Sequence, residues 1–287
     1  MIYDSIVVGH GPAGLTASIY LKRANKNVIS IGKDFGVLSN PHIKIENYFG
    51  YKNTPGINIV KEAFEHAKEL GCEIITDEVV SIDCDDNFFE VTTVNNKFKG
   101  LTLILATGQK RATLRIEGLN RFAGKGISYC ATCDGFFYRN KKIALIGHSK
   151  YMLQELKDLS SITNDITIFT NGETLNDPVH YPVITDRIIK FIGEESIEAI
   201  ETQSGSYTID GVFIAYGVAG GLDIARKLGV LIEDNDIIVN HNNETNISGL
   251  FAAGDITKGR KQITKASYDG MIAAHGVIEY LYRRKEK

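Results

Sequence analysis

The chain has 287 residues, enough for two domains of ordinary size, and 43% of them are hydrophobic against 23% charged, as in globular proteins. Its formal net charge of −3 gives no overall attraction to nucleic acid or to a membrane. The apolar runs are only as long as strands, and the first residues contain Asp4 but no basic cluster, so we expect neither a membrane span nor a signal peptide. The sequence indicates a cytoplasmic protein.

The N-terminal part predicts a βαβ unit followed by a group of short strands. In order, the expected elements are a strand over 4–8, a glycine-rich turn over 9–14, a helix over 15–25, a strand over 27–31, a helix over 57–70 before Gly71, strands over 79–83, 88–93 and 97–99, and an apolar strand over 101–106.

The βαβ pattern begins again in the middle of the chain. The expected elements there are a strand in KKIALIG (141–147), a helix to about residue 159, a strand over 165–170, the segment FIAYG (213–217), a strand over 249–255 and a helix over 262–282. Gly9 and Gly147 start equivalent turns, so the chain contains an internal repeat. We expect an α/β protein with two Rossmann-like domains, of the type that binds FAD or NAD(P), the second inserted into the first.

The turn Gly9-His10-Gly11-Pro12-Ala13-Gly14 has the spacing of a dinucleotide-binding turn. Gly9 permits the tight turn, Gly11 lets the backbone approach a pyrophosphate, and Gly14 allows the helix to pack closely on the strand. The helix N-terminus near Pro12 directs amides and a positive dipole end at the phosphates. The acidic residue expected after the second strand is missing, and Asp34 is the nearest carboxylate.

The four cysteines are too few for a disulfide framework in a chain of this length. Cys72 and Cys84 lie in segments that predict ordinary structure. Cys130 and Cys133 form a Cys-x-x-Cys pair, which fits a redox disulfide, half of a zinc site or a coincidence. Zinc requires four ligands, and no second pair or Cys/His cluster supplies them, so no metal is expected.

Five ordered segments carry a family resemblance along the whole chain: GHGPAG (9–14), IENYFG (45–50), LATG (105–108), CATCDG (130–135) and LFAAGDI…RKQITKASYDGMIAA (250–274). With these segments the chain resembles the thioredoxin reductases of low molecular weight. The resemblance implies an FAD-binding domain over 1–112 and 222–287, a central redox domain over 113–221 that resembles an NAD(P)H domain, a homodimer, and thioredoxin as the protein partner, with no nucleic-acid or membrane partner.

The resemblance also implies which residues hold FAD. They are Gly9, Gly11, Pro12, Ala13, Gly14, Asn47, Val79, Thr107, Gly108, Asp255, Lys261, Gln262 and Ile263. By the same resemblance, Cys133 faces the flavin, Cys130 attacks the disulfide of the partner, and Asp134 donates and accepts the protons that dithiol formation requires. An alternative for Asp134 is a helix cap.

The second glycine turn departs from the family pattern, in which this unit binds NADPH. Ser149 stands where a glycine should admit the pyrophosphate, and Met152 replaces a small residue at the contact of helix and strand. Thr170-Asn171-Gly172-Glu173 stands where arginines should bind the 2′-phosphate. Each lost charge-assisted bond is worth about 1.5–3 kcal/mol, so we expect weak NADPH binding.

This combination resembles one branch of the family, the ferredoxin-dependent flavin thioredoxin reductases. The sequence therefore predicts an enzyme that passes electrons from reduced ferredoxin through FAD and Cys130–Cys133 to thioredoxin. The alternatives are an NADPH-dependent thioredoxin reductase and a flavin-binding redox sensor without turnover. Ferredoxins are usually acidic, so basic residues near the flavin or at the C-terminus are candidates for docking. They are Lys258, Arg260, Lys261, Lys265, Arg283, Arg284 and Lys285.

Overall fold

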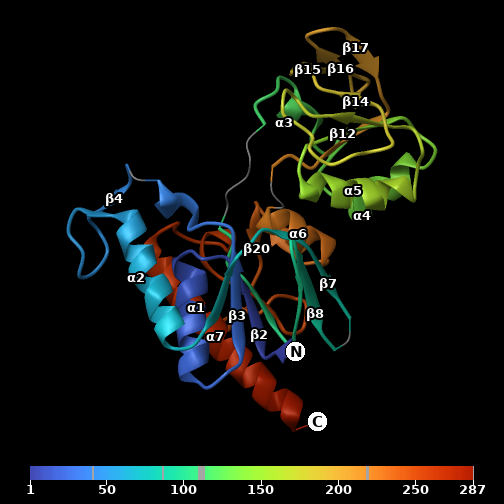
Figure 1. Ribbon diagram of the computed structural model, residues 1–287. Helices are drawn as coiled ribbons and strands as arrows, with labels where there is room; N and C mark the ends of the chain where they lie inside the picture. The colour runs from blue at the N-terminus through green and yellow to red at the C-terminus, as the bar shows by residue number, and fades with distance from the viewer. Residues whose placement is uncertain (41, 86, 109–113, 218–219, 287) are drawn as a thin grey trace. The chain divides into compact units, whose positions relative to one another are not determined.

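The computed structural model describes residues 1–40, 42–85, 87–108, 114–217 and 220–286 (Figure 1). The chain divides into two compact units, one of Met1–Lys110 with Gly220–Lys287 and the other of Arg111–Ala219. Each unit contains a five-stranded parallel sheet, which confirms the α/β class and the repeated Rossmann-like unit. The two boundaries of the second unit lie within or beside residues outside the described ranges.

The first unit is built on a parallel sheet with the strand order β21-β10-β2-β3-β6. These strands are β21 (Leu250–Ala252), β10 (Leu103–Leu105), β2 (Ser5–Val8), β3 (Val28–Gly32) and β6 (Glu73–Thr76). A second sheet contains β1 (Ile2–Tyr3), β9 (Lys97–Gly100), β8 (Phe89–Thr93) and β7 (Val79–Cys84), and two short pairs are β4 (Lys44–Ile45) with β5 (Thr54–Pro55) and β19 (Ile232–Glu233) with β20 (Asp236–Ile237).

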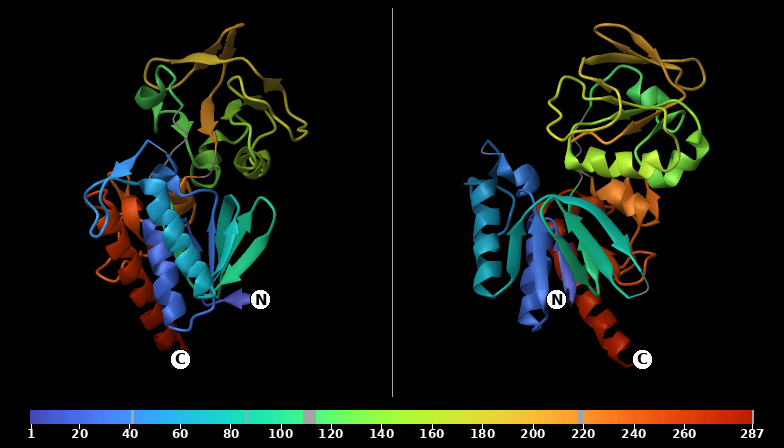
Figure 2. Two further views of the ribbon diagram at one scale, coloured as in Figure 1. Left: turned by 60° about the vertical axis from the view of Figure 1, so that its left-hand side comes forward. Right: turned by 45° about the vertical axis from the view of Figure 1, so that its right-hand side comes forward.

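Helices cover one face of this parallel sheet, and the sheet that contains β7 and β8 lies on the other (Figures 1 and 2). The covering helices are α1 (Pro12–Arg23), α2 (Gly56–Glu69) and α7 (Ile263–Lys285), and shorter ones are α6 (Gly221–Lys227), η1 (Gly36–Ser39) and η3 (Gly254–Ile256). Every residue of β2 is buried, because the strand is central and covered on both faces.

The second unit has a parallel sheet with the order β11-β18-β12-β13-β14 and a separate antiparallel sheet. The parallel strands are β11 (Ile127–Ser128), β18 (Gly211–Ile214), β12 (Ile143–Ile146), β13 (Ile166–Phe169) and β14 (Val183–Ile184). The antiparallel strands are β15 (Ile188–Ile192), β16 (Ala199–Thr202) and β17 (Ser206–Thr208), and the helices are α3 (Leu119–Phe122), α4 (Ala131–Asp134), η2 (Gly135–Tyr138) and α5 (Lys150–Ser160).

Strand order determines where a ligand can bind in the first unit. The chain leaves β2 toward β3 and β6, whereas β10 and β21 lie on the other side of β2. Val8 pairs with Leu105 on one side and with Ile31 on the other, so the carboxyl ends of three strands lie at one level. Ligands of open α/β sheets bind at such a switch point.

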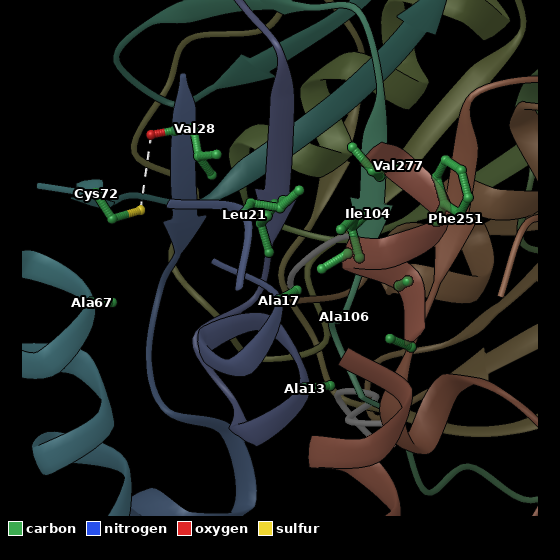
Figure 3. Close-up of a cluster of buried hydrophobic side chains, with 14 of the residues drawn as sticks. Ala13, Ala17, Leu21, Val28, Ala67, Cys72, Ile104, Ala106, Phe251 and Val277 are labelled. Carbon is green, nitrogen blue, oxygen red and sulfur yellow. Dashed lines mark hydrogen bonds between the residues drawn. The ribbon is translucent and has the colours of Figure 1, made fainter. Parts of the chain in front are cut away.

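A cluster of buried side chains joins α1 and α7 to the parallel sheet (Figure 3). Ala17 and Leu21 of α1 pack there with Phe251 of β21, and all three are fully buried. Cys72 is also buried, and its thiol donates to the carbonyl oxygen of Val28 at 3.8 Å. Burial raises the pKa of the Cys72 thiol to about 11, which suits a structural and unreactive cysteine.

The observed elements differ from the expected ones mainly at their ends. Helix α1 begins at Pro12, where the glycine turn placed its N-terminus, but it ends at Arg23, two residues before the expected end. The strand expected over 101–106 contains only Leu103–Leu105, and FIAYG contributes only its first two residues to β18. Cys84 was expected to be structural, yet it is exposed at the end of β7. Within the described ranges, no helix is long and apolar enough to cross a membrane.

A buried tyrosine makes the first unit sensitive to alkaline pH. Tyr3 donates to a carboxylate oxygen of Glu73 at 2.7 Å, and burial together with this bond raises the pKa of Tyr3 from 10.0 to about 12. A raised pKa stabilises the folded state below pH 10, and this contribution is lost as the pH rises from about 10 to about 12. We expect Tyr3→Phe to remove about 2–3 kcal/mol of that pH dependence, measured by urea unfolding. The control Tyr282→Phe, at an exposed tyrosine, should lose unfolding free energy with rising pH as steeply as the wild type. The same steepness in Tyr3→Phe would contradict the assignment.

Candidate functional site

The first glycine turn is tightly packed on its inner side and open on its outer side. A Cβ atom on Gly14 would lie 1.9 Å from the carbonyl oxygen of Gly9, and one on Gly9 would lie 2.3 Å from that of Ala106. Gly9 also has a φ of +119°, which side chains rarely adopt. By contrast, a Cβ on Gly11 would have no neighbour within 4 Å. The open space at Gly11, beside the first residues Pro12 and Ala13 of α1, fits a pyrophosphate.

Two further segments reach the same edge of the sheet. Thr107 and Gly108 follow β10, and Asp255 lies in η3 directly after β21. The Thr107 hydroxyl oxygen occupies the space beside Gly221, where a Cβ would lie 1.8 Å from it. Gly108 has a φ of +65° and open space on its Cβ side. The parallel register of β2, β10 and β21 therefore brings three of the expected segments together.

A hydrogen bond links two other expected residues that are 215 positions apart. The side-chain amide of Asn47 donates to the side-chain oxygen of Gln262 at 2.9 Å. Ile263 begins α7 and packs against a buried cluster that includes Ile45, close to Asn47 in the sequence. Val79, the remaining expected contact, is buried at the start of β7.

A buried carboxylate organises the turn that holds Asp255. Asp269 accepts hydrogen bonds from the Gly254 amide at 3.1 Å and the Thr257 hydroxyl at 3.0 Å, and it pairs with Lys265 at 2.7 Å. Burial raises the pKa of Asp255, although the positive charge of Lys265 opposes the shift. Asp255 is thus held in a fixed turn where its carboxyl group can meet a polar ligand.

The expected redox pair is a disulfide in the structure. Cys130 and Cys133 are joined with their Cα atoms 5.3 Å apart, at the end of β11 and the start of α4. Cys130 precedes the first residue of α4, and its Sγ accepts the Cys133 amide at 3.1 Å. Cys130 is only 2% exposed, whereas Cys133 is exposed. The sulfur expected to attack the partner is therefore the covered one in the oxidised protein.

Asp134 is tied to the disulfide through one hydroxyl group. Ser128 donates to a carboxylate oxygen of Asp134 at 2.6 Å, and its oxygen accepts the Cys130 amide at 3.1 Å. Asp134 makes no side-chain capping bond at the start of η2, so the helix-cap alternative is wrong. Its carboxyl group lies near the redox pair, as its expected role in proton transfer requires.

Two aromatic side chains project from η2 directly after the redox helix. Phe136 and Phe137 are 67% and 70% exposed, and their rings lie 6.3 Å apart. The Arg139 guanidinium lies 5.1 Å from the centre of the Phe136 ring. Large apolar side chains are rarely exposed together without a partner. This apolar pair offers a contact surface beside the disulfide.

The second glycine turn is filled by side chains of the protein. A Cβ on Gly147 would lie 2.3 Å from the carbonyl oxygen of Ala215 and 2.7 Å from the Cβ of Met152, which is fully buried. Ser149 directs its hydroxyl away from α5 and donates to the carbonyl oxygen of Gly217 at 2.5 Å. Ser149 stands at the position equivalent to Gly11, which has no side chain and open space.

The strand end beside this turn is also occupied. Tyr216 donates to the Glu173 carboxylate at 3.0 Å, and the His148 ring packs edge-on against Tyr216 at 5.1 Å. A cation that the sequence did not indicate is present as well, because Arg187 lies beside Gly172, with its Cγ 3.1 Å from the position of a Cβ. Arg187 precedes β15, in a part of the chain for which we expected only mixed structure.

Comparison with known proteins agrees with this geometry. A family model described as pyridine nucleotide-disulphide oxidoreductase matches residues 3–270. The thioredoxin reductase of Bacillus subtilis is 30% identical, over 99% of this chain and 96% of the relative. This chain belongs to the low-molecular-weight thioredoxin reductase family. Its fold is therefore that of the FAD- or NAD(P)-binding domains of thioredoxin reductases.

Two solved structures of the family are similar to this chain. The atypical thioredoxin reductase TRi from Desulfovibrio vulgaris Hildenborough has a TM-score of 0.89 and 30% identity, over 97% of this chain and 98% of that one. A ferredoxin-flavin thioredoxin reductase from Clostridium acetobutylicum has a TM-score of 0.69 and 29% identity, over 98% of both chains. This chain is thus similar both to an atypical reductase and to one named for ferredoxin.

Sequence reasoning missed several side chains of this thioredoxin reductase site. Ser128 and Asp269 lie in or beside segments that carried the resemblance, but their bonds connect residues that the pattern treats separately. His10 is buried beside Gly32, where a Cβ would lie 2.8 Å from its ring, and its Nε2 has no hydrogen-bond partner among the described residues. Burial lowers the pKa of His10, so a neutral imidazole stands near the strand end that lacks the usual acidic residue.

The two inner glycines of the first turn should tolerate substitution very differently. Gly14→Ala places a methyl group against the Gly9 carbonyl, so we expect the free energy of unfolding to fall by at least about 3 kcal/mol. Gly11→Ala places the same group in open space and should change it by less than about 1 kcal/mol. Chemical denaturation of both variants checks this difference, which equal losses of stability would contradict.

Proposed function

We propose that this chain is a ferredoxin-dependent flavin thioredoxin reductase, which passes two electrons from reduced ferredoxin through FAD and the Cys130–Cys133 disulfide to thioredoxin. The observation that carries the proposal is the contrast between the two glycine turns. The first is open at Gly11, whereas the second is filled by the bond from Ser149 to the Gly217 carbonyl. One dinucleotide site is kept and the other is lost.

The first unit fits FAD. Gly11 and the amides at the start of α1 would hold the pyrophosphate, and the Asp255 carboxyl group would meet a hydroxyl group of the cofactor. The hydrogen-bonded pair of Asn47 and Gln262, with Lys261 beside it, would line the flavin ring. Bound FAD supplies the ability to accept single electrons and to deliver a pair to a disulfide.

The second unit does not fit a nicotinamide cofactor. Pyrophosphate approach needs bare backbone at the position of Ser149, whose hydroxyl instead satisfies a backbone carbonyl. Glu173, which accepts from Tyr216, adds negative charge where a 2′-phosphate would bind. The NADPH-dependent alternative is favoured by one observation, the position of Arg187 beside Gly172. A single exposed arginine does not replace a pyrophosphate turn.

The protein partner must carry a disulfide that Cys130 can attack. Reduction of the Cys130–Cys133 disulfide takes two electrons and two protons, and Asp134 is placed to donate and accept a proton. Exchange with thioredoxin then re-forms the Cys130–Cys133 disulfide and leaves thioredoxin as a dithiol. The exposed apolar pair beside the site suits a protein rather than a small thiol as the substrate. A redox sensor without turnover would need no such surface.

Electron transfer from ferredoxin to thioredoxin is favourable in free energy. A plant-type ferredoxin near −400 mV is about 130 mV more reducing than thioredoxin near −270 mV, which is about 6 kcal/mol for two electrons. Each ferredoxin supplies one electron, so two are oxidised for each thioredoxin disulfide reduced.

The basic cluster near the flavin edge is less available for docking than its sequence indicates. Lys261 pairs with Asp236 at 2.6 Å, and Lys265 pairs with Asp269 at 2.7 Å. Lys258 lies 3.6 Å from Glu233. At the other end of the chain, Arg284 donates to the carbonyl oxygen of Asn87 at 2.8 Å. These pairings reduce the attraction to an acidic ferredoxin, and the docking surface stays a prediction.

The choice of electron donor separates the proposal from its NADPH-dependent alternative. With excess NADPH or NADH under anaerobic conditions, we expect the flavin to stay oxidised over the time of turnover. Reduced ferredoxin should bleach the flavin and drive thioredoxin reduction. Stopped-flow absorbance with each donor measures this directly. Ser149→Gly alone should not restore NADPH use, because Met152 would still fill the turn and the 2′-phosphate would still meet Glu173 instead of arginines. Rapid bleaching by micromolar NADPH in the wild type would refute the proposal.

A serine substitution tests the assignment of the redox pair. Cys130→Ser should lower thioredoxin reduction by more than about a thousandfold, since the attacking sulfur is lost, while flavin reduction by ferredoxin continues. Cys84→Ser is the matched control, because Cys84 is an exposed free cysteine, and it should retain wild-type turnover. An equal loss of turnover in folded Cys84→Ser protein would show that the redox pair is wrongly assigned.

A further inference from the structure

Helix α5 places a buried carboxyl group against the redox helix. Glu155 is 1% exposed, and one of its carboxyl oxygens accepts the backbone amide of Ala131 at 3.0 Å. Helices α4 and α5 are in contact (Figure 1). A carboxyl group is rarely buried unless hydrogen bonds satisfy it, because its desolvation is costly. Glu155 is not part of the Cys-x-x-Cys segment and takes no part in the proposed electron and proton transfers.

The buried face of α5 shows that Glu155 stands at an apolar position. The buried residues of this helix recur at helical spacing and are Tyr151, Met152, Glu155, Leu156 and Leu159. An aliphatic residue would complete the stripe, so the carboxyl group serves a polar contact. That contact is with the first residue of α4, the redox helix.

Three backbone amides around the disulfide each have an acceptor. The Cys130 amide donates to the Ser128 hydroxyl at 3.1 Å, the Ala131 amide donates to Glu155 at 3.0 Å, and the Cys133 amide donates to the Cys130 sulfur at 3.1 Å. The first amides of a helix have no acceptor within the helix, so side chains must satisfy them. Glu155 thereby fixes Ala131, which lies along the chain between the Cys130 amide and the Cys133 amide.

We propose that Glu155 is a positioning residue for the redox pair: by holding the Ala131 amide, it keeps the Cys133 amide directed at the Cys130 sulfur after the disulfide opens. An amide that donates to a thiolate favours the charged form. A more stable Cys130 thiolate shifts the equilibrium toward the dithiol and gives a better nucleophile at neutral pH. The inference rests on the redox role of Cys130–Cys133 in the proposed function, but not on the identity of the electron donor.

The test is the dithiol–disulfide equilibrium of the flavin-loaded protein in glutathione redox buffers, read by alkylation and mass spectrometry. We expect Glu155→Ala to shift this equilibrium about fivefold to tenfold toward the disulfide, and to slow alkylation of Cys130 in the reduced protein by a similar factor. Glu155→Gln keeps an acceptor oxygen and should stay within about twofold of wild type. Asp158→Ala removes a half-buried carboxylate from the same helix and is the matched control, with no shift expected.

Three outcomes would overturn the inference. Folded Glu155→Ala protein with the wild-type equilibrium would remove the positioning role, and an equal shift in Glu155→Gln, which keeps an acceptor oxygen, would show that the hydrogen bond to the Ala131 amide is not the cause. If Glu155→Ala does not fold, hydrogen exchange of the Ala131 amide in reduced wild-type protein decides, since exchange as fast as in an open chain would contradict the contact. Failure of the redox role itself is a different result, because the wild-type pair would then show no glutathione-dependent change at all, whereas a different electron donor would leave this equilibrium as it is.

Discussion

The close approach of helix α1 to the ends of β2 and β10 is the contact on which the first unit depends. Gly14 can lie against the Gly9 carbonyl only because it lacks a side chain, as the 1.9 Å separation from a Cβ position shows. This contact holds the first amides of α1 at the edge that Thr107 and Asp255 also reach. In the second unit, Met152 occupies the position equivalent to Gly14, and α5 starts beside a side chain instead of bare backbone.

The polar groups at the carboxyl ends of the parallel strands are therefore satisfied in different ways in the two units. In the second unit, polar groups that would otherwise face a ligand bond to one another, as Ser149 does with Gly217 and Tyr216 with Glu173. Such internal bonds make ligand binding less favourable, because they must be broken before a phosphate can replace them. On the proposed function, loss of the nicotinamide cofactor and gain of these internal hydrogen bonds would be two aspects of one change.

The sequence was informative where structure is local. The glycine turns, the Cys-x-x-Cys pair and the βαβ repeat depend on residues a few positions apart, so spacing alone predicted them. Contacts between distant segments were not predictable in this way. Asn47 meets Gln262, Glu155 meets Ala131 and Arg187 reaches Gly172 only after the chain has folded. The antiparallel sheet of β15 to β17 was also missed, because its short strands lack a clear alternating pattern.

The unequal exposure of the two sulfurs gives the oxidised site a direction of reaction. A small thiol from solution can approach Cys133 but not Cys130, which is 2% exposed, so a mixed disulfide would form on Cys133 and release Cys130. The released sulfur stays within reach of the new bond and attacks it at a high effective concentration, which expels the small thiol again. A small thiol would therefore add to Cys133 and be expelled again with no net transfer of electrons, so such thiols reduce the oxidised disulfide only slowly.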